Sequence, residues 1–358
     1  MKVLITGGAG FLGSHLTDAF LERGDEVFIL DTGTTLKVKH RIGDPRLHYV
    51  RDSVLNEVIL EGLIARVDLV YHLAAVVGVE HYVGDPYQVL NVNVNGTQNV
   101  LKLAFKHGKR VVFSSTSEVY GRNSKIPWSE DDDRVLGSTR IDRWCYSTSK
   151  AIGEHFCFAY AKMGLKVTVV RYFNVYGPKL DAIDVGRVIT IFLGQALRGE
   201  PVTVIGDGRQ TRCFTYVTDA VAATVEAGLR EQAVGEIINI GNDREYTIRE
   251  LAERLIRAAG SKSTIRYVPQ QEIYGTSYED IPRRIPNLQK MHEILGVTAE
   301  VSLDEGLRRT IDYFRESRVE TRERGLRQVK SVARLQTSHG KRPDDDPGSL
   351  GGGNELVA

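Results

Sequence analysis

The sequence predicts an α/β fold in which a doubly wound parallel sheet carries a smaller C-terminal region. Over the first 115 residues, short apolar runs rich in β-branched side chains alternate with longer amphipathic stretches. Strands that are apolar throughout are typical of a parallel sheet whose two faces are both covered by helices. After about residue 175 the pattern loosens into segments punctuated by glycine. Such segments indicate a smaller region over the carboxyl edge of the sheet.

The predicted elements alternate between strand and helix along the chain. The expected strands are residues 2–6, 26–31, 67–73, 110–114 and 166–171, and the expected helices are residues 11–23, 89–107 and 151–162. A further strand is presumed to end just before Asp52. The later part of the chain offers segments 186–198, 202–207 and 247–259. We therefore expect residues 1–175 to form a core to which later segments return, and residues 176–315 to form mainly the region that selects a substrate.

The end of the chain has a different composition. Residues 316–358 contain a charged run up to Arg327, three consecutive aspartates at 344–346 and three consecutive glycines at 351–353. A segment of this kind buries too little apolar surface to offset the entropy lost on ordering. We expect a charged tail from residue 316 and disorder from about residue 330 to the end.

Charge and composition exclude several classes of partner. The chain has 47 Lys plus Arg against 46 Asp plus Glu, a formal net charge of +1, so no overall field attracts nucleic acid or an acidic membrane. No apolar run reaches the roughly 18 to 20 residues that span a bilayer. Cys145, Cys157 and Cys213 are too few and too widely spaced for a disulfide framework or a four-ligand zinc site, so no metal is expected. Because nothing resembles a secretion signal, the expected location is cytoplasmic.

A glycine-rich turn between the first strand and the first helix indicates a dinucleotide site. Its candidate contacts are Gly7, Gly10, Phe11, Leu12 and Gly13. Glycine lets the backbone turn tightly and approach a pyrophosphate, which the amide groups at the helix N-terminus then hold. Asp31 ends the next strand 21 residues after Gly10. A carboxylate there accepts hydrogen bonds from ribose hydroxyls and repels a 2′-phosphate, which favours NAD over NADP.

Two further strand ends add candidate cofactor contacts. Asp52 and Ser53 follow the presumed third strand and can meet the adenine edge. Leu73, Ala74 and Ala75 end the fourth strand, where small residues leave room for a cofactor. Both groups lie at carboxyl ends of successive strands, which is where ligands bind in open α/β sheets.

A hydroxyl cluster and a tyrosine and lysine pair supply the candidate chemistry. Residues 113–121 read FSSTSEVYG and place several hydroxyls and one carboxylate just past a buried strand. Tyr146 and Lys150 are four residues apart, about one helical turn, and so share a helix face. Lys150 and the positive charge of NAD are expected to lower the pKa of Tyr146 from about 10 toward neutrality. Tyr146 then serves as a general base.

Together these motifs resemble the extended short-chain dehydrogenase/reductases, and within them the NAD-dependent nucleotide-sugar epimerase/dehydratase family. The resemblance covers about residues 1–315. It rests on residues 6–13, Asn95-Gly96-Thr97, the Ser-Thr-Ser-Glu cluster, residues 146–150, residues 171–178 (RYFNVYGP) and residues 206–217 (GDGRQTRCFTYV). It implies a Rossmann core over residues 1–175, NAD as the cofactor and a nucleotide-diphosphate sugar as the substrate.

The resemblance also implies a catalytic triad of Thr116, Tyr146 and Lys150. Tyr146 accepts the proton of the sugar 4-hydroxyl as hydride leaves C4 for the nicotinamide. Lys150 holds the ribose and tunes Tyr146, while Thr116 hydrogen-bonds the reacting oxygen. Tyr172 and Val175 complete the implied cofactor contacts.

The implied substrate contacts centre on the diphosphate. Asn174 contacts it, and Arg187 and Arg212 neutralise it, in agreement with the fit between guanidinium forks and phosphate. The further implied contacts are Tyr82, Ser117 and Val204.

The reaction depends on what lies beside the C4 ketone. The chain is closest in motifs to UDP-glucuronate decarboxylases, which it resembles in Thr-Ser-Glu, in Arg143 three residues before Tyr146 and in Arg284 two residues before a proline. In that reading, Arg284 binds the hexuronate carboxylate, and Glu118 positions it or manages the proton at C5. Glu118 and Arg284 then join the catalytic residues, and Arg143 joins the substrate contacts. The expected reaction is oxidation at C4, loss of carbon dioxide and reduction at C4.

Other functions stay open. A 4-epimerase acting on UDP-glucose or UDP-glucuronate is the first alternative, because residues 76–85 lack the proline-rich character of xylose-forming enzymes. A sugar-nucleotide 4,6-dehydratase is the second, because Thr-Ser-Glu also occurs in GDP-mannose dehydratases. Ser117 argues against the thymidine-sugar type, which has aspartate at that position. A non-catalytic NAD-binding regulator on the same scaffold is the third alternative, and the intact triad argues against it.

A homodimer is also expected. In the family that the chain resembles, the helices corresponding to residues 89–107 and 151–162 pair across a two-fold axis. The first of these offers apolar residues in partly helical spacing, although packing on its own sheet explains several of them. They are Val89, Val92, Val100, Leu103 and Ala104.

Overall fold

The computed structural model describes residues 1–269, 272 and 281–316. Residues 1–311 form one compact unit and residues 312–358 a second. Of the second unit, the described residues 312–316 are helical. The segment predicted to be disordered, from about residue 330 onward, lies outside the described residues.

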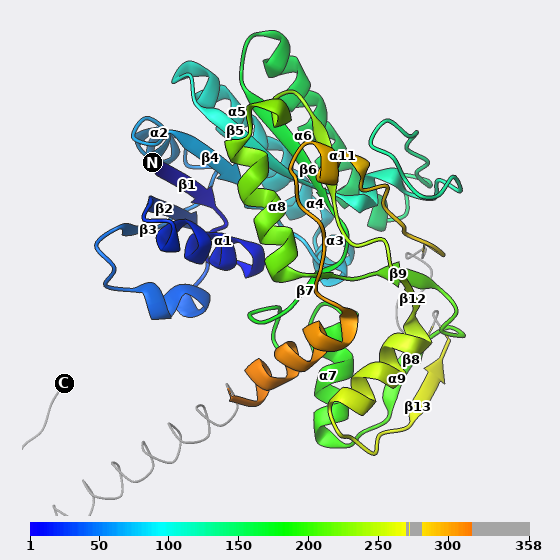
Figure 1. Ribbon diagram of the computed structural model, residues 1–358. Helices are drawn as coiled ribbons and strands as arrows, with labels where there is room; N and C mark the ends of the chain where they lie inside the picture. The colour runs from blue at the N-terminus through cyan, green and yellow to red at the C-terminus, as the bar shows by residue number, and fades with distance from the viewer. Residues whose placement is uncertain (270–271, 273–280, 317–358) are drawn as a thin grey trace, which may run out of the picture. The chain divides into compact units, whose positions relative to one another are not determined.

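A parallel sheet of seven strands runs through the described part of the first unit (Figure 1). Its strands are β1 (Lys2–Thr6), β2 (Glu26–Asp31), β3 (Leu47–Arg51), β4 (Leu69–His72), β5 (Arg110–Thr116), β6 (Val167–Tyr172) and β11 (Ile237–Ile240). The spatial order is β11-β6-β5-β4-β1-β2-β3, with each neighbouring pair parallel. Because the winding direction reverses between β1 and β4, the carboxyl ends of these two strands flank a crevice suited to a ligand.

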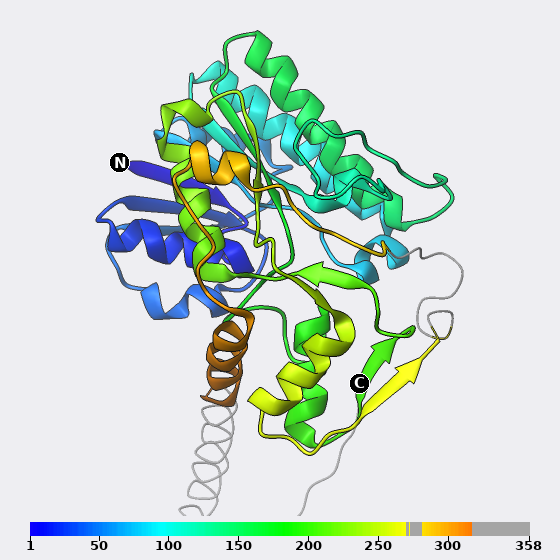
Figure 2. The same cartoon turned by 45° about the vertical axis from the view of Figure 1, so that its right-hand side comes forward.

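Helices cover both faces of this sheet, as the apolar strands require (Figure 2). On one face lie α1 (Phe11–Glu22) and α8 (Val217–Leu229), which pack on each other. On the other face lie α2 (Glu57–Ile64), α5 (Gly96–Lys106) and α6 (Arg143–Lys162). The apolar sides of these three helices meet the sheet in one buried cluster that includes Leu101, Phe113 and Cys157. The doubly wound α/β fold predicted from the sequence is thereby confirmed.

The predicted helix over residues 89–107 is present but contains a π-helical turn. The chain forms α3 (Val79–Gly84), α4 (Pro86–Leu90), a π-helical turn η2 (Asn91–Asn95) and then α5. The cause is Asn93, which is buried and bonds across to other segments: its amide oxygen accepts from Val76 N at 2.8 Å and its amide nitrogen donates to Ser149 Oγ at 3.1 Å. A π-turn admits an inserted residue into a helix and is frequent at functional sites.

The later part of the chain forms a smaller region beside the carboxyl edge of the sheet, with α7 and α9 packed together against β8 (Figure 1). Its elements are β7 (Val175–Tyr176), α7 (Val188–Arg198), β8 (Val202–Ile205), β9 (Thr211–Cys213), β10 (Thr215–Tyr216), β12 (Glu245–Thr247), α9 (Ile248–Ala258) and β13 (Ile265–Val268). The short helix α11 (Gln289–Glu293) instead packs against β11 of the large sheet. Three strand pairs stiffen it: β8 with β13, β9 with β12 and β7 with β10. Helix α8 and strand β11 return to the large sheet, so residue 175 does not separate two compact units. The predicted division at this residue into a cofactor part and a substrate part stays a prediction.

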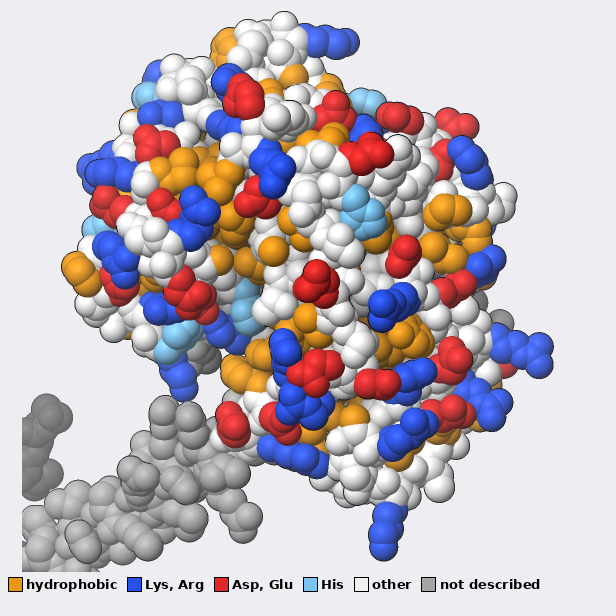
Figure 3. All heavy atoms as spheres, in the orientation of Figure 1, with side chains coloured by type: hydrophobic (Ala, Val, Ile, Leu, Met, Phe, Trp, Pro, Cys, Tyr) orange, Lys and Arg blue, Asp and Glu red, His pale blue; other side chains and the backbone are white. Residues whose placement is uncertain are grey.

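Short helical turns complete the fold. They are η1 (Thr35–Arg41), η3 (Ser117–Tyr120) and η4 (Glu231–Ala233), and residues 303–311 are also helical. Positive and negative side chains are interspersed over the face shown in Figure 3, as the near-zero net charge leads one to expect. Among the described residues, no helix is both long and apolar enough to cross a membrane.

Candidate active site

One pocket at the carboxyl edge of the sheet gathers most of the predicted site residues. It has a volume of about 1780 Å³, larger than the roughly 300 to 1,000 Å³ of a typical small-molecule site, so it has room for two ligands. The predicted residues that line it are Gly7, Gly10, Phe11, Leu12, Gly13, Asp31, Asp52, Ser53, Leu73, Ala74, Ala75, Tyr82, Thr116, Ser117, Glu118, Tyr146, Lys150, Tyr172, Asn174, Val175, Arg187, Arg212 and Arg284. These residues come from eleven separate stretches of the chain, which the fold brings together.

Two predicted substrate contacts do not line the pocket. Val204 is fully buried, whereas its neighbours Thr203 and Ile205 line the pocket, because successive side chains of β8 point to opposite faces. Arg143 is 1% exposed and lies behind Glu118, with which it forms an ion pair. Direct contact of these two residues with a substrate stays a prediction, and for Arg143 the ion pair with Glu118 offers an indirect route to the pocket.

The glycine turn has the form required by a bound diphosphate. Gly7 has a φ of +73°, and a Cβ on it would lie 2.8 Å from Ala74 N, closer than real Cβ atoms come. A Cβ on Gly13 would lie 2.1 Å from Gly7 O. Helix α1 starts at Phe11 with no side-chain cap and no acidic residue in its first turn, so its N-terminal amides are left to an anion. These residues fit the pyrophosphate of a dinucleotide.

Asp31 lies at the end of β2, beside this turn. One of its carboxylate oxygens accepts from Ala9 N at 2.9 Å and the other from Gly33 N at 2.8 Å. A carboxylate has about four lone-pair positions, so both oxygens retain capacity for the hydroxyls of a ribose. Lys37 of η1, which the sequence reasoning missed, also lines this part of the pocket. Burial lowers the pKa of Lys37, while the charges of Asp181 and Asp31 act in the opposite direction.

A group of charges around Asp18 ties two pocket segments to α1. Asp18 pairs with Lys179 at 2.6 Å, with Arg41 at 2.7 Å and with His40 at 2.8 Å. His40 and Arg41 end η1, and Lys179 belongs to the loop after β7. His15, also on α1, lies 2.8 Å from the carbonyl oxygen of Pro178 in the same loop. These contacts join residues far apart in sequence, and none of the sequence motifs predicted them.

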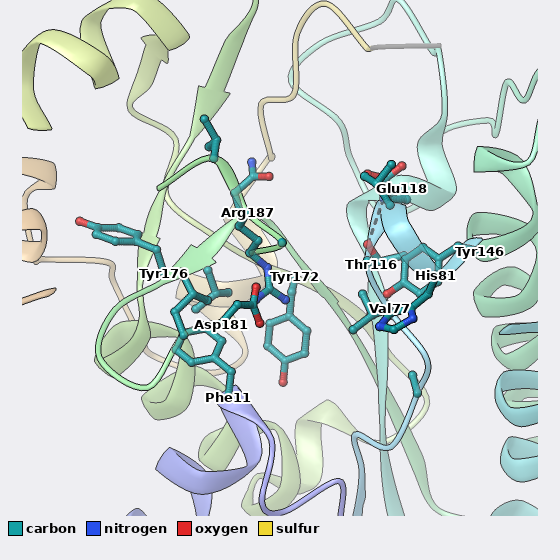
Figure 4. Close-up of a pocket in the computed structure, with 18 of the residues that line it drawn as sticks. Phe11, Val77, His81, Thr116, Glu118, Tyr146, Tyr172, Tyr176, Asp181 and Arg187 are labelled. Atoms are coloured by element: carbon teal, nitrogen blue, oxygen red, sulfur yellow. Dashed lines mark hydrogen bonds and ion pairs between the residues drawn. The ribbon is translucent and has the colours of Figure 1, made fainter. Parts of the chain in front are cut away.

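The predicted reaction centre is formed where β5 meets α6. Tyr146 is 8% exposed and hydrogen-bonds with Thr116, and its ring stacks at 6.0 Å on that of Tyr82. Lys150, one helical turn further on, donates from Nζ to the carbonyl oxygen of Ser114 at 2.8 Å. Thr116, Tyr146 and Lys150 therefore converge on the pocket, as Figure 4 illustrates for the first two.

The expectation that Lys150 lowers the pKa of Tyr146 is wrong for the protein without its ligands. Burial, and after it the charge of Glu118, raise the pKa of Tyr146 above its usual value, which Arg187 and the bond with Thr116 offset only in part. Burial also lowers the pKa of Lys150 to about 8. The physical reason is desolvation, which disfavours both the phenolate and the ammonium when no partner charge is close.

Glu118 is held between two arginines. Its Oε1 lies 2.6 Å from Arg284 Nη1 and its Oε2 lies 2.9 Å from Arg143 Nη2. Burial tends to raise the pKa of Glu118, but the two guanidinium groups outweigh it and lower that pKa to about 2. Glu118 is therefore ionised, and the group of three side chains carries one net positive charge. In addition, the buried Nε of Arg284 has no hydrogen-bond partner among the described residues.

Three further residues that line the pocket are suited to a diphosphate. Asn174 has a φ of +37° and donates from its amide to Cys213 O at 2.9 Å. Arg212 is mostly buried and donates to Thr211 O at 2.7 Å. Arg187 pairs with Asp181 at 2.9 Å and lies 5.7 Å above the ring of Phe11, and Figure 4 shows these three side chains together. Arg187 thus lies next to the glycine turn.

The arrangement defines what the pocket can do chemically. A phenol and a hydroxyl can hydrogen-bond one oxygen of a ligand, a buried guanidinium faces the pocket on one side, and further cationic groups stand toward the other. No group of three or more His, Cys, Asp or Glu side chains within residues 1–269, 272 and 281–316 is placed to hold a metal ion. The geometry suits acid and base chemistry on an elongated anionic ligand beside a dinucleotide.

Comparison with known proteins gives a consistent result. Residues 3–241 match the NAD-dependent epimerase/dehydratase family. The chain is 43% identical over 316 residues to the UDP-N-acetyl-α-D-glucosaminuronate decarboxylase of Bacillus cytotoxicus, covering 88% of this chain and 98% of that protein. It is 39% identical over 320 residues to UDP-glucuronic acid decarboxylase 1 of Danio rerio, covering 87% and 72% respectively. It also resembles the crystal structure of UDP-glucuronic acid 4-epimerase from Bacillus cereus in complex with UDP-glucuronic acid and NAD, with a TM-score of 0.79, 31% identity and coverage of 88% and 99%.

Proposed function

The chain belongs to the NAD-dependent epimerase/dehydratase family, and from this premise we propose that it decarboxylates a UDP-linked hexuronate. It is an NAD-dependent enzyme of the extended short-chain dehydrogenase/reductase type. The two curated relatives described above are named as decarboxylases of UDP-glucuronate and of its 2-acetamido analogue. The proposal takes these two uronates as the candidate substrates.

The observation that carries the proposal is the group of Glu118, Arg143 and Arg284. Its net positive charge, and the buried Nε of Arg284 that lacks a partner among the described residues, suit a ligand carboxylate. A neutral hexose would leave this charge without a counterion, which is costly in a buried site. We assign Arg284 the binding of the C6 carboxylate. Since Glu118 is already ionised between two arginines, we assign it the orientation of Arg284 rather than the transfer of a proton.

The proposed reaction uses two groups in the pocket: the hydroxyls of Tyr146 and Thr116, and the guanidinium of Arg284. When bound, NAD takes up hydride from C4 of the sugar and later returns it. Tyr146 accepts the proton of the 4-hydroxyl, and the resulting C4 ketone makes the uronate a β-keto acid. The C5–C6 bond then breaks, carbon dioxide leaves, and the electron pair moves into the C4 carbonyl, whose oxygen Tyr146 and Thr116 hydrogen-bond. A proton added at C5 restores the ketone before C4 is reduced.

A 4-epimerase is the second candidate. The uronate-bound epimerase structure similar to this chain supports it, because that protein also has a pocket for a hexuronate. Epimerisation requires the keto sugar to turn over before reduction, whereas decarboxylation requires only that the carboxylate be held and the ketone polarised.

The test is to incubate the protein with UDP-glucuronate, its 2-acetamido analogue and UDP-glucose and to follow carbon dioxide. We expect gas from a uronate and none from UDP-glucose; no gas from either uronate would contradict the proposal.

The choice of cofactor should depend on Asp31. Replacing Asp31 with alanine removes the acceptor for the ribose hydroxyls and the repulsion of a 2′-phosphate, so the preference for NAD over NADP should narrow by about 10- to 100-fold. Calorimetric or fluorescence titration with both dinucleotides measures this. Asp31→Asn is the matched variant, because it retains the shape of the side chain and one of its two acceptor oxygens but removes the charge. Equal affinity of the unsubstituted protein for NAD and NADP would refute the role of Asp31.

We also propose that the protein is a homodimer through α5 and α6. The two helices pack on each other, with the rings of Phe105 and Tyr160 5.7 Å apart. Large apolar side chains are exposed nearby: Tyr87 is 74%, Leu90 38% and Phe105 37% exposed. Such a group of apolar side chains supports an interface. Light scattering at micromolar concentration should give twice the monomer mass, and a monomer would contradict this.

A cytoplasmic location is proposed for a chemical reason. Cys145, Cys157 and Cys213 are all free thiols in the structure, which suits a reducing compartment.

A further inference from the structure

We propose that residues 76–82 form a wall that selects a 2-acetamido uronate over a 2-hydroxy uronate. The inference rests on the proposed decarboxylation and names which of the two candidate substrates the pocket fits. The wall, here called the valine wall, contains Val76, Val77, Gly78, Val79, Glu80, His81 and Tyr82, all of which line the pocket.

The orientation of a bound hexuronate follows from three fixed points. C1 carries the diphosphate and C4 lies opposite it across the ring, so a sugar whose C4 oxygen meets Tyr146 directs C1 away from Tyr146. The C6 carboxylate, attached at C5, points to Arg284 and Glu118 in the proposed function. The C2 and C3 edge must then face the side of the ring opposite to Glu118.

The valine wall occupies that opposite side. In Figure 4, Val77 and His81 stand beside Tyr146 and Thr116, with Glu118 on the far side of this pair. Val76 and Val79 pack against the buried cluster formed by Tyr82, Val89 and Tyr146. The wall is therefore in contact with the catalytic tyrosine, and its exposed side chains meet the C2 substituent.

The backbone conformation of the valine wall is held by contacts within the protein, without a bound substrate. Asn93 holds both backbone groups of Val76: its amide oxygen accepts from Val76 N at 2.8 Å and its amide nitrogen donates to Val76 O at 3.2 Å. The next turn depends on Gly78, whose φ of +126° is open to glycine and strained for other residues. Between these two anchors, Val77 projects into the pocket with 44% of its surface exposed. The π-turn that interrupts the helix thus serves to position the wall.

Val77, the apolar side chain that projects from the wall into the pocket, suits the acetamido group better than a hydroxyl. The methyl of the acetamido group buries against Val77, and we assign the imidazole of His81, which lines the same wall, a hydrogen bond with the amide. A 2-hydroxyl has no methyl group to bury, so it would leave the isopropyl group of Val77 facing water. A methyl-sized difference in an apolar pocket typically changes kcat/KM by about 10- to 200-fold. We expect a preference in this range.

The test compares kcat/KM for UDP-N-acetylglucosaminuronate and UDP-glucuronate, measured as carbon dioxide released. The unsubstituted protein should prefer the acetamido substrate by at least about tenfold. Val77→Thr has the same shape and adds a hydroxyl that can bond to a 2-hydroxyl, so it should lower this ratio several-fold. Val77→Phe fills the space of the acetamido methyl and should reduce turnover of the acetamido substrate more than that of UDP-glucuronate.

The control is Val58→Thr, a matched change on α2 at a side chain that is 81% exposed and does not line the pocket; it should leave the ratio unchanged. Preference for UDP-glucuronate, or Val77 variants that change both substrates equally, would overturn the inference while leaving decarboxylation intact. Carbon dioxide from neither uronate would instead overturn the proposed function. The two failures are therefore distinguishable.

Discussion

Replacing Tyr146 with phenylalanine is expected to lower kcat by about 10² to 10⁴ while leaving the fold unchanged. The phenol oxygen is the group that takes the proton from the sugar 4-hydroxyl, and phenylalanine keeps the ring that stacks on Tyr82 at 6.0 Å. Because the hydroxyl bonds with Thr116 rather than with a structural partner, its loss should cost little stability. Steady-state rates of carbon dioxide release and a thermal melt of the same sample measure the two effects.

The protonation state of Tyr146 before ligands bind also bears on this role. Burial raises the pKa of Tyr146 in the protein without ligands, so the phenol is protonated at neutral pH until binding changes its surroundings. Tyr267→Phe is the matched control, because it removes a phenol from a side chain that is 47% exposed and does not line the pocket, so kcat should be unchanged. A Tyr146→Phe variant with more than about a tenth of the original kcat would contradict the assignment of the base.

Replacing Arg284 with alanine is expected to separate oxidation from decarboxylation. The substrate carboxylate loses its counterion, so kcat/KM for carbon dioxide release should fall by about 10² to 10³, the usual range for a buried charged partner. Oxidation at C4 depends on Tyr146, Thr116 and Lys150 and should partly persist, visible as a transient change in nicotinamide absorbance. Glu118 retains its pair with Arg143 at 2.9 Å, so the variant should fold.

Two further variants distinguish charge from geometry at this position. Arg284→Lys keeps the charge but loses the planar fork, and it should restore part of the activity lost in Arg284→Ala. Arg249→Ala, on the outer surface of α9 and paired with Glu253 at 3.0 Å, is the control for removal of an arginine and should be neutral. Equal loss of oxidation and decarboxylation in Arg284→Ala would place Arg284 in general substrate binding and contradict its specific role.

Short-range sequence patterns were enough to predict the fold and to predict that the glycine turn and Asp31 lie together at one pocket. The glycine turn and Asp31 lie within one strand, one helix and the next strand, so their meeting follows from the βαβ arrangement alone. Tyr146 and Lys150 were predictable for a similar reason, since they lie one turn apart on a single helix.

Contacts between distant segments of the chain could not be predicted from the sequence. Glu118 and Arg284 were both expected at the site, but their 2.6 Å ion pair joins a turn after β5 to a segment of the C-terminal region, and no pattern encodes that approach. For the same reason the ion pair between Arg143 and Glu118 at 2.9 Å could not be predicted from the sequence. Asn93 was hidden in an apparently continuous helix, because its bonds to Val76 and Ser149 depend on tertiary packing.

The pKa of Tyr146 shows a second limit of sequence reasoning. Spacing predicted that Lys150 would favour the phenolate, but the balance of charges depends on where each side chain points. In the structure, Lys150 donates to the Ser114 carbonyl, and burial dominates both groups. Desolvation is a property of the packed protein and cannot be inferred from the distance between two residues along a helix.

The most direct test of the central claim is the fate of individual atoms when a UDP-hexuronate labelled at C6 is converted in heavy water. Decarboxylation predicts that the label leaves entirely as carbon dioxide, that the sugar gains one deuterium at C5, and that the original hydrogen at C4 is retained because NAD returns it. Mass spectrometry and NMR of the product measure all three. A product that retains labelled C6 and has inverted configuration at C4, with no deuterium at C5, would contradict the account and identify a 4-epimerase.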